Sequence, residues 1–287
     1  MIAGYRVADV HVHIQPWEMH PTAVQHAMES GRDDLDRIRA FMASPKEFLA
    51  HLDTCGIERV GLINYVAPDV MGFTGEVNEW GARYAAAAPD RLIPFGSVNP
   101  RFISDPAGET ERVLDLGIRA LKVHPPHQLF AVNEYRTGGA GAGIGEVFRV
   151  AEERGVPVMI HTGTSVFPGA RNAYADPMPA DDVGVDFPRL RVILAHAGRP
   201  MFGEAAHFLV RRHPNFHLDL SSIPPKRLLQ YVPRLAAVAD RCLWGSDWPS
   251  PGVAGLRKNV DEFLTLDLDD TARRAILWDN AARMFGE

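Results

Sequence analysis

Short apolar segments rich in β-branched residues recur along the chain, and segments with helical patterning lie between them. The apolar segments are, in order, YRVADVHVHI, IERVGLINYV, RLIPFGSVN, GIRALKVHPP, GVPVMIHTG, LRVILAHAG, NFHLDLSS and RCLWGSDWP. Strands that alternate with helices predict a parallel sheet covered by helices. Eight such units in 287 residues predict an α/β fold, a closed (β/α)8 TIM barrel that forms one domain over residues 1–287.

The segment SPKEFLAHLDTCG shows how the predicted helices are delimited. Ser44 is placed to cap the helix, Pro45 suits its first turn, Glu47 completes a capping box and Gly56 ends the helix. Further helices are predicted at 76–88, 107–117, 143–155, 179–188, 201–214, 225–240 and 269–286. The main alternative is a doubly wound open sheet, but no glycine-rich nucleotide-binding turn follows any early strand.

Two connections are longer than the others, 14–43 after the first predicted strand and 125–142 after the fourth. Because both follow strands, both lie on the face of a barrel where active sites are built. Long connections at such a face commonly serve as lids or as walls of a substrate pocket. We therefore expect these two connections to determine which substrate is bound.

Composition and charge exclude several classes of protein. The net charge of −6 and the pI near 6.1 argue against a nucleic-acid-binding surface. The two cysteines, Cys55 and Cys242, lack metal-site spacing and suit a reducing compartment. No apolar stretch approaches ~18 residues, and the first residues carry no signal-peptide pattern. We expect a cytoplasmic protein with a small-molecule substrate, no nucleic-acid or membrane partner and, from base rates alone, a homodimer.

The first apolar segment contains two histidines with alternating spacing. Side chains alternate between the faces of a strand, so His11 and His13 share one face while Val10 and Val12 take the other. The helix-facing side of a barrel strand is apolar, which directs both histidines into the lumen, roughly 6.5 Å apart at their Cα atoms. Two imidazoles at this spacing can bind one ion through bonds of about 2.1 Å. The alternative for either histidine is a hydrogen-bonded core residue; for the pair, metal binding is favoured.

Three other predicted strands end on residues that can also bind a metal or act as a base. The fifth ends with His161 in MIHTG, the sixth with His196 in LAHAG and the eighth with Asp247 in WGSD. Each is a potential metal ligand or base at the carboxyl end of a strand, where a barrel gathers its catalytic residues. Together with the first pair, they predict a metal centre.

At these positions the chain resembles the amidohydrolase superfamily, and within it the branch of decarboxylase-like metal-dependent hydrolases. The matching motifs are DVHVHI, ALKVHPP, VMIHTG, VILAHAGRP, LWGSDWP and DNAARMFG, spread over essentially the whole chain. The resemblance implies one divalent metal, usually Zn²⁺ with Mn²⁺ or Fe²⁺ as alternatives, bound by His11, His13, His161 and Asp247. His196 is then either an additional ligand or a general acid/base beside the metal-bound water.

Such a metal centre supports more than one reaction. A metal-bound water with a pKa near 7 supplies hydroxide at neutral pH, and Asp247 or His196 can accept its proton. This scheme describes hydrolysis of a small amide, lactone or ester carbonyl, which is the function we expect. The alternative is non-oxidative decarboxylation of an aromatic or unsaturated carboxylic acid. A barrel that binds metal without catalysis is the least favoured.

Four further residues are candidates for substrate contact: Lys122, His124, Arg199 and Trp248. Strand alternation directs Lys122 and His124 into the lumen, where an ammonium must be paired, neutral or modified. In some superfamily members a carboxylated lysine on this strand bridges two metals; a lysine that binds a substrate carboxylate is favoured here. Because decarboxylase-branch relatives generally lack this lysine, its presence favours hydrolysis.

The remaining candidates are less specific. Arg199 could anchor an anionic substrate or brace a loop, and Trp248 could line an apolar pocket or pack in the core. Asp219, on the lumen side of the seventh strand, could orient a ligand histidine or serve as a structural hydrogen-bond partner.

Overall fold

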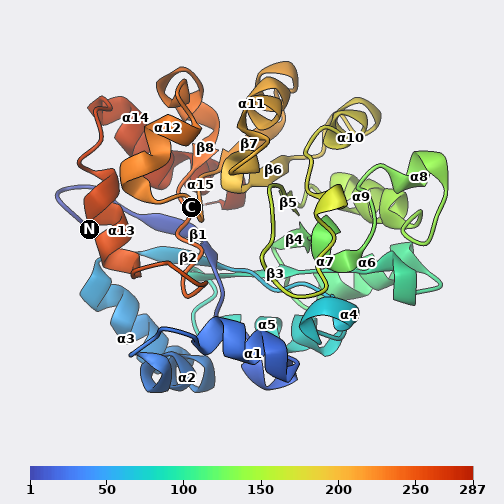
Figure 1. Ribbon diagram of the computed structural model, residues 1–287, viewed down its shortest axis with the longest axis horizontal. Helices are drawn as coiled ribbons and strands as arrows, with labels where there is room; N and C mark the ends of the chain where they lie inside the picture. Colours follow the sequence, from blue (N-terminus) through green and yellow to red (C-terminus); the bar gives the residue numbers. More distant parts are fainter. Residues whose placement is uncertain (287) are drawn as a thin grey trace.

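The computed structural model describes residues 1–286, and its centre is one parallel sheet of eight strands in the order β1 to β8 (Figure 1). The strands are β1 Ala8–Val12, β2 Arg59–Leu62, β3 Leu92–Gly96, β4 Ala120–Val123, β5 Val158–His161, β6 Val192–Ala195, β7 Phe216–Asp219 and β8 Cys242–Leu243. Each strand lies within one of the eight predicted segments. The (β/α)8 barrel expected from the sequence is confirmed.

The barrel closes where the chain beyond β8 runs beside β1. Val10 N–H donates to the Trp244 carbonyl at 2.9 Å, and Asp247 N–H donates to the His11 carbonyl at 2.8 Å. His13 N–H donates to the Trp248 carbonyl at 2.8 Å, one step further along the same seam. These backbone bonds hold the end of β1 and the residues after β8 at one edge of the barrel.

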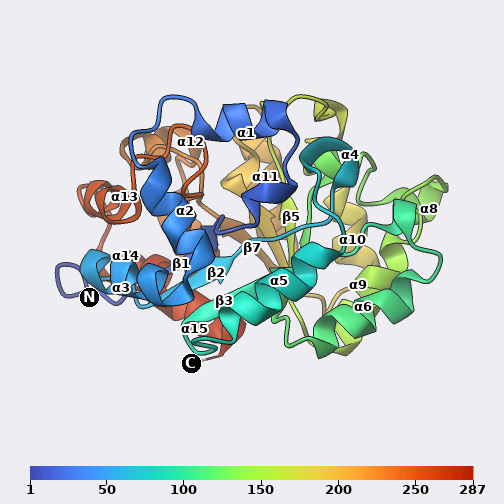
Figure 2. The ribbon, with the colours of Figure 1, turned by 90° about the horizontal axis from the view of Figure 1, so that it is seen from below.

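Helices surround the sheet, and α1 and α4 lie along the upper edge of Figure 2, away from both chain ends. The α-helices are α1 Thr22–Glu29, α2 Leu35–Ala43, α3 Pro45–Cys55, α4 Pro68–Met71, α5 Glu76–Ala85, α6 Pro106–Asp115, α7 Pro125–Gln128, α8 Glu134–Thr137, α9 Ile144–Glu153, α10 Ala180–Asp186, α11 Gly203–Arg212, α12 Leu228–Tyr231, α13 Leu256–Phe263, α14 Asp270–Arg274 and α15 Asn280–Phe285. Shorter turns are 3₁₀ helices at Trp17–Met19, Pro100–Phe102, Asn172–Tyr174, His196–Gly198, Pro225–Arg227 and Leu235–Arg241, and a π-helix at Ala275–Asp279. Among residues 1–286, no helix has the length and apolar character needed to cross a membrane.

Local sequence signals explain the boundaries of α3 and the interruption of one predicted helix. Ser44 Oγ accepts a hydrogen bond from Glu47 N–H at 3.3 Å, and Gly56 ends α3 with a φ of 74°, as predicted. The single helix predicted over 225–240 is wrong. Two 3₁₀ turns and the four-residue α12 replace it, because Pro233 lacks an N–H and disfavours helical backbone at Val232, whose ψ is 72°.

The two long connections carry short helices of their own. Residues 14–43 contain a 3₁₀ turn, α1 and α2, whereas residues 125–142 contain the one-turn helices α7 and α8. Both connections follow the carboxyl ends of their strands, β1 and β4, and therefore lie on the expected face of the barrel.

Packing beside the barrel seam leaves no space for a side chain at Gly245. A Cβ atom there would lie 2.4 Å from Asp219 Oδ1 and 2.9 Å from the Cβ atoms of His11 and Ser221. We predict that Gly245→Ala lowers the free energy of unfolding by about 1–3 kcal/mol, measured by urea denaturation. Gly75→Ala is the control, because no atom lies within 4 Å of its added Cβ. Equal stability of the two variants would contradict this packing.

Candidate metal centre

One cavity of about 260 Å³ opens at the carboxyl ends of the strands and gathers nearly all of the predicted site residues. The predicted residues that line it are His11, His13, Lys122, His124, His161, His196, Arg199 and Asp247. Residues far apart in sequence thus share one chamber, as strand-end placement predicted.

Three of the four expected metal ligands converge directly. His13 Nε2 lies 2.9 Å from Asp247 Oδ1, and His11 Nε2 lies 3.5 Å from the same oxygen. One ligand atom from each of these residues falls within a group spanning 4.8 Å. His11 is buried, and its Nε2 has no hydrogen-bond partner in the described part of the chain. A buried nitrogen that lacks a partner next to an imidazole and a carboxylate suits a divalent cation.

Backbone conformation contributes to this convergence. Asp247 has a φ of 70° and His196 a φ of 63°, both in the left-handed region that residues other than glycine rarely adopt. Such conformations cost of order 1–3 kcal/mol each and persist only where the surrounding structure imposes them. His196 directly follows β6 and Asp247 comes four residues after the end of β8, and at both positions the left-handed residue carries a polar side chain that lines the cavity.

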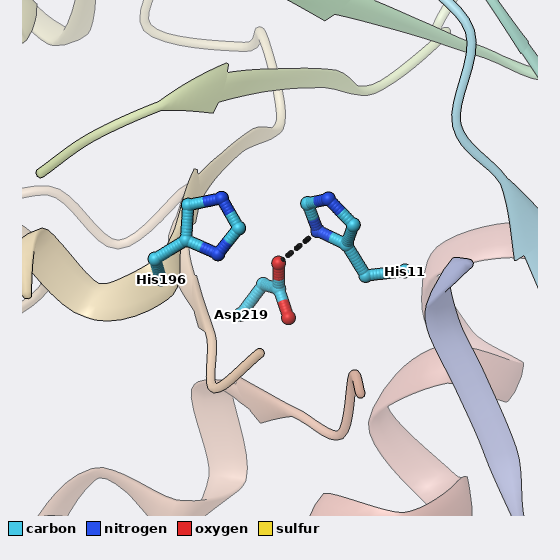
Figure 3. Close-up of side chains that lie close together, drawn as sticks. All are labelled: His11, His196 and Asp219. Carbon is cyan, nitrogen blue, oxygen red and sulfur yellow. Dashed lines mark hydrogen bonds and ion pairs between the residues drawn. The ribbon is translucent and has the colours of Figure 1, made fainter. Parts of the chain in front are cut away.

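His11 is oriented from behind by Asp219, as one of the two sequence interpretations proposed (Figure 3). His11 Nδ1 lies 2.5 Å from Asp219 Oδ2, and both side chains are almost fully buried. Ser221 N–H donates to the other carboxylate oxygen, Oδ1, at 3.0 Å. A carboxylate on Nδ1 leaves the Nε2 lone pair of His11 facing the cavity.

A second cluster, formed by His11, His196 and Asp219, also has ligand atoms within 4.8 Å of one another. Its members already hydrogen-bond through the hydroxyl of Ser221, which lies 3.1 Å from His11 Nδ1 and 2.8 Å from His196 Nδ1. The cluster of His11, His13 and Asp247 therefore fits a metal better.

His161 lines the same cavity but contacts other groups. Its Nδ1 lies 3.1 Å from His196 Nε2, and its Nε2 lies 3.1 Å from the carbonyl oxygen of Gly163. Its ring stacks on His124 with centroids 3.7 Å apart. The structure thus places the fourth expected ligand in the same cavity but in contact with His196, outside the group formed by His11, His13 and Asp247.

The amidohydrolase family model matches residues 8–286. The chain belongs to this family. An L-fucono-1,5-lactonase from Burkholderia ambifaria is 33% identical over 117 residues, which are 35% of this chain and 40% of the lactonase. The chain thus matches less than half the length of this relative.

Solved structures share the fold of the amidohydrolase at low sequence identity. An uncharacterised TIM-barrel protein from Bordetella bronchiseptica has a TM-score of 0.73 and 22% identity, covering 97% of this chain and 98% of its own. A dihydroxybenzoic acid decarboxylase from Polaromonas, solved with manganese and 2-nitroresorcinol, has a TM-score of 0.70 and 19% identity, covering 98% and 97%. The family model thus shows the family, and these solved structures show the same barrel fold over nearly the whole chain.

Burial keeps the imidazoles of the amidohydrolase neutral. Burial first, and then nearby positive charge including that of Lys122, holds the pKa values of His11, His161 and His196 well below the usual range. Burial raises the pKa of Asp247, but the hydrogen bond from His13 and the positive charges around it outweigh burial and lower that pKa overall. Neutral imidazoles beside an ionised carboxylate are the protonation states that metal binding requires.

Lys122 is the most unusual cation of the site. It is 1% exposed, and among residues 1–286 its Nζ has no hydrogen-bond partner. Burial lowers its pKa to about 8, although Asp219 and Asp247 act in the opposite direction. Its charge therefore remains available to an anionic group in the cavity at neutral pH.

Two other predicted substrate contacts lie in different environments. Arg199 lines the cavity, and its guanidinium donates to the Thr164 carbonyl at 2.9 Å and to Ser222 Oγ at 2.6 Å. Its Nε is buried and lacks a partner within the described chain. Trp248 is outside the cavity lining and stacks on Phe48 of α3 with ring centroids 6.3 Å apart. Its placement corresponds to the core-packing alternative.

Sequence reasoning overlooked several polar residues around the cavity. His127 stacks on His124 with centroids 3.6 Å apart and lies between Tyr65 OH at 3.0 Å and Ser165 Oγ at 2.7 Å. The three-residue spacing from His124 to His127 was a signal available for this pair. Ser221 follows Asp219 by two residues, which is the strand alternation that identified the other lumen residues.

Replacing Lys122 tests the cost of its burial. In the folded amidohydrolase the pKa of Lys122 falls from 10.5 to about 8, which corresponds to about 3 kcal/mol of destabilisation at neutral pH. We predict that Lys122→Met stabilises the metal-free protein by up to about 3 kcal/mol at pH 7, measured by urea unfolding.

The unfolded chain binds more protons than the folded one between about pH 8 and 10.5, so wild-type stability should rise with pH across this window relative to the variant. Lys46→Met, at an exposed lysine, is the control and should change stability by less than about 0.5 kcal/mol. A Lys122→Met variant less stable than wild type would show that the ammonium is favourably paired.

Proposed function

We propose that this amidohydrolase hydrolyses a small lactone, ester or amide carbonyl with one divalent metal, Zn²⁺ by preference, held by His11, His13, His161 and Asp247. The observation that supports this proposal most is the buried His11 Nε2, which has no hydrogen-bond partner within the described chain and lies beside His13 and Asp247 in an open cavity. The similarity to a lactonase supports a lactone as the first substrate to test.

A divalent ion bound here supplies a water of lowered pKa and polarises a carbonyl oxygen. Asp247, ionised because its pKa is lowered, accepts the proton of the attacking water and returns it to the leaving oxygen or nitrogen. Asp219 keeps the ring of His11 in one orientation through the contact at Nδ1. His196 contacts His161 and Ser221.

Lys122 and Arg199 indicate that the substrate carries an anionic group in addition to the carbonyl that is hydrolysed. Asp247 is the only carboxylate among the described residues that line the cavity, and both cations have nitrogens without partners. A carboxylate or sulfonate on the substrate satisfies these donors. His124, stacked between His127 and His161, forms the adjoining wall.

Decarboxylation is the second candidate, because the decarboxylase neighbour shares the fold over nearly the whole chain. The same cations could hold the carboxylate that departs as CO₂. Assays in ¹⁸O-labelled water with lactones and with hydroxybenzoates distinguish the reactions. Hydrolysis places ¹⁸O in the product carboxylate, whereas decarboxylation releases CO₂ from an unlabelled product. Release of CO₂ with no turnover of any lactone, ester or amide would reject hydrolysis.

Asp247→Asn tests the proton acceptor. An amide cannot take up the proton of water, so we predict a loss of kcat of at least about 100-fold, in line with the contribution of a positioned base. The activity of the variant should be compared at equal metal content, since Asp247 is also an expected ligand. Retention of kcat within a few-fold of wild type at full metal occupancy would assign the base elsewhere.

Arg199→Met tests recognition of the anionic group. Loss of a charge-assisted hydrogen bond costs about 1.5–3 kcal/mol, so KM for a carboxylate-bearing substrate should rise about 10- to 100-fold. The matched control is Arg171→Met, at an exposed arginine, which should leave KM unchanged. An equal change of KM for substrates with and without the acid group would contradict the assignment.

A further inference from the structure

The hydroxyl of Ser221 joins three side chains of the site that come from three different strand ends. Ser221 Oγ lies 2.7 Å from Asp219 Oδ2, 3.1 Å from His11 Nδ1 and 2.8 Å from His196 Nδ1. The residue is fully buried, so bulk water cannot substitute for any of these contacts. No step of the proposed function uses this hydroxyl.

The carboxylate of Asp219 determines the direction of the hydrogen bonds that Ser221 Oγ makes. Asp219 Oδ1 accepts a hydrogen bond from Ser221 N–H, and Asp219 Oδ2 lies within hydrogen-bond distance of His11 Nδ1 and Ser221 Oγ. Three potential donors around one carboxyl group suit its ionised form. A carboxylate has no proton to donate, so the single hydroxyl proton of Ser221 belongs to the bond with Asp219. The Ser221 oxygen is then only an acceptor, and His196 Nδ1 must donate to it.

The opposite direction leaves an unfavourable contact. If Ser221 donated to His196 Nδ1, its oxygen and Asp219 Oδ2 would face each other at 2.7 Å without a proton between them. Two buried acceptors in such a contact lose a hydrogen bond and repel each other. Only one arrangement therefore satisfies both contacts of the hydroxyl.

We propose that Ser221 is a positioning residue that, together with Asp219, fixes both His11 and His196 with the proton on Nδ1. Both rings then present the lone pair of Nε2 to the cavity side of the site. For His11 this is the nitrogen that has no hydrogen-bond partner among residues 1–286, and for His196 it is the nitrogen 3.1 Å from His161 Nδ1. This assignment rests on the proposed function only in taking these rings as parts of the working site.

The placement of the His196 lone pair has a consequence for its neighbour. His161 Nε2 lies 3.1 Å from the Gly163 carbonyl oxygen, which can only accept a hydrogen bond, so His161 carries its proton on Nε2 and its Nδ1 presents a lone pair to His196 Nε2. The two lone pairs can then face one cation. A hydroxyl that is not part of the cavity lining thus determines which nitrogen of His196 is available. Asp219 orients the ring of His11, and Ser221 extends this control to the ring of His196.

Nitrogen NMR of the metal-free protein tests the tautomers without an activity assay. Protein labelled with ¹⁵N-histidine and treated with chelator is measured near pH 8, and the His196 signals are assigned with a His196→Gln variant. We expect protonated Nδ1 and unprotonated Nε2 at His11 and His196. In Ser221→Ala the His196 signals should move toward a mixture of both tautomers.

Ser222→Ala is the matched control, because the neighbouring hydroxyl contacts Arg199 and no imidazole nitrogen among the described residues. It should leave the His196 tautomer unchanged. Protonated Nε2 at His196 in the wild type, or unchanged His196 signals in a folded Ser221→Ala variant, would overturn the proposal.

Asp219→Asn supplies a second variant with an expected reversal. An amide NH₂ in place of Oδ2 donates to Ser221 Oγ, so the hydroxyl proton turns to His196 Nδ1 and the ring proton moves to Nε2. The same amide should move the proton of His11 to Nε2. Unchanged tautomers at both rings would contradict the proposed direction of the bonds.

Titration with Zn²⁺ alone connects the tautomers to metal binding. Removal of a residue that orients ligands typically weakens metal affinity 10- to 100-fold, and we expect this loss in Ser221→Ala and less than a two-fold change in Ser222→Ala. Equal affinities of wild type and Ser221→Ala would count against the positioning role. A wild-type protein that binds no metal would reject the proposed function, whereas the NMR result would still decide the tautomers.

Discussion

The seam between β1 and the chain after β8 is the constraint on which the site depends. Asp247 N–H donates to the His11 carbonyl across this seam, so a backbone bond joins two residues whose side chains also meet at the candidate metal centre. The backbone bonds that close the barrel therefore also bring the site residues together. A sheet left open at this edge would separate His11 and His13 from Asp247.

Electrostatics explains why the cavity is suited to an anion and a cation together. The imidazoles of His11, His161 and His196 are buried, and burial keeps their pKa values low, so they can offer lone pairs to a cation without adding charge. Lys122 and Arg199 supply positive charge beside this cluster, and within residues 1–286 Lys122 Nζ and Arg199 Nε have no hydrogen-bond partner. The left-handed backbone at His196 and Asp247 and the buried ammonium of Lys122 all cost stability, which is typical of residues kept for function.

The alternation of side chains along a strand was the most useful signal in the sequence, because its period of two residues is fixed by the backbone. It identified the lumen-facing His11 and His13 and the inward direction of Lys122 and His124, whereas the eight strands followed from the recurring apolar segments. The same rule could have identified Ser221 beyond Asp219. Strand alternation could not predict contacts that depend on packing between elements, such as the stacking of Trp248 on α3. It also gave no information on helices, and the helix predicted over 225–240 is interrupted around Pro233.

The central claim is that His11, His13, His161 and Asp247 hold one divalent ion at the mouth of the barrel. Anomalous diffraction from crystals grown with Zn²⁺ or Mn²⁺ tests it most directly. We predict one strong anomalous peak within bonding distance of His11 Nε2, His13 Nε2 and the Asp247 carboxylate, with His161 turned to complete the set. The absence of a peak at saturating metal, or a peak bound by other residues, would contradict the account.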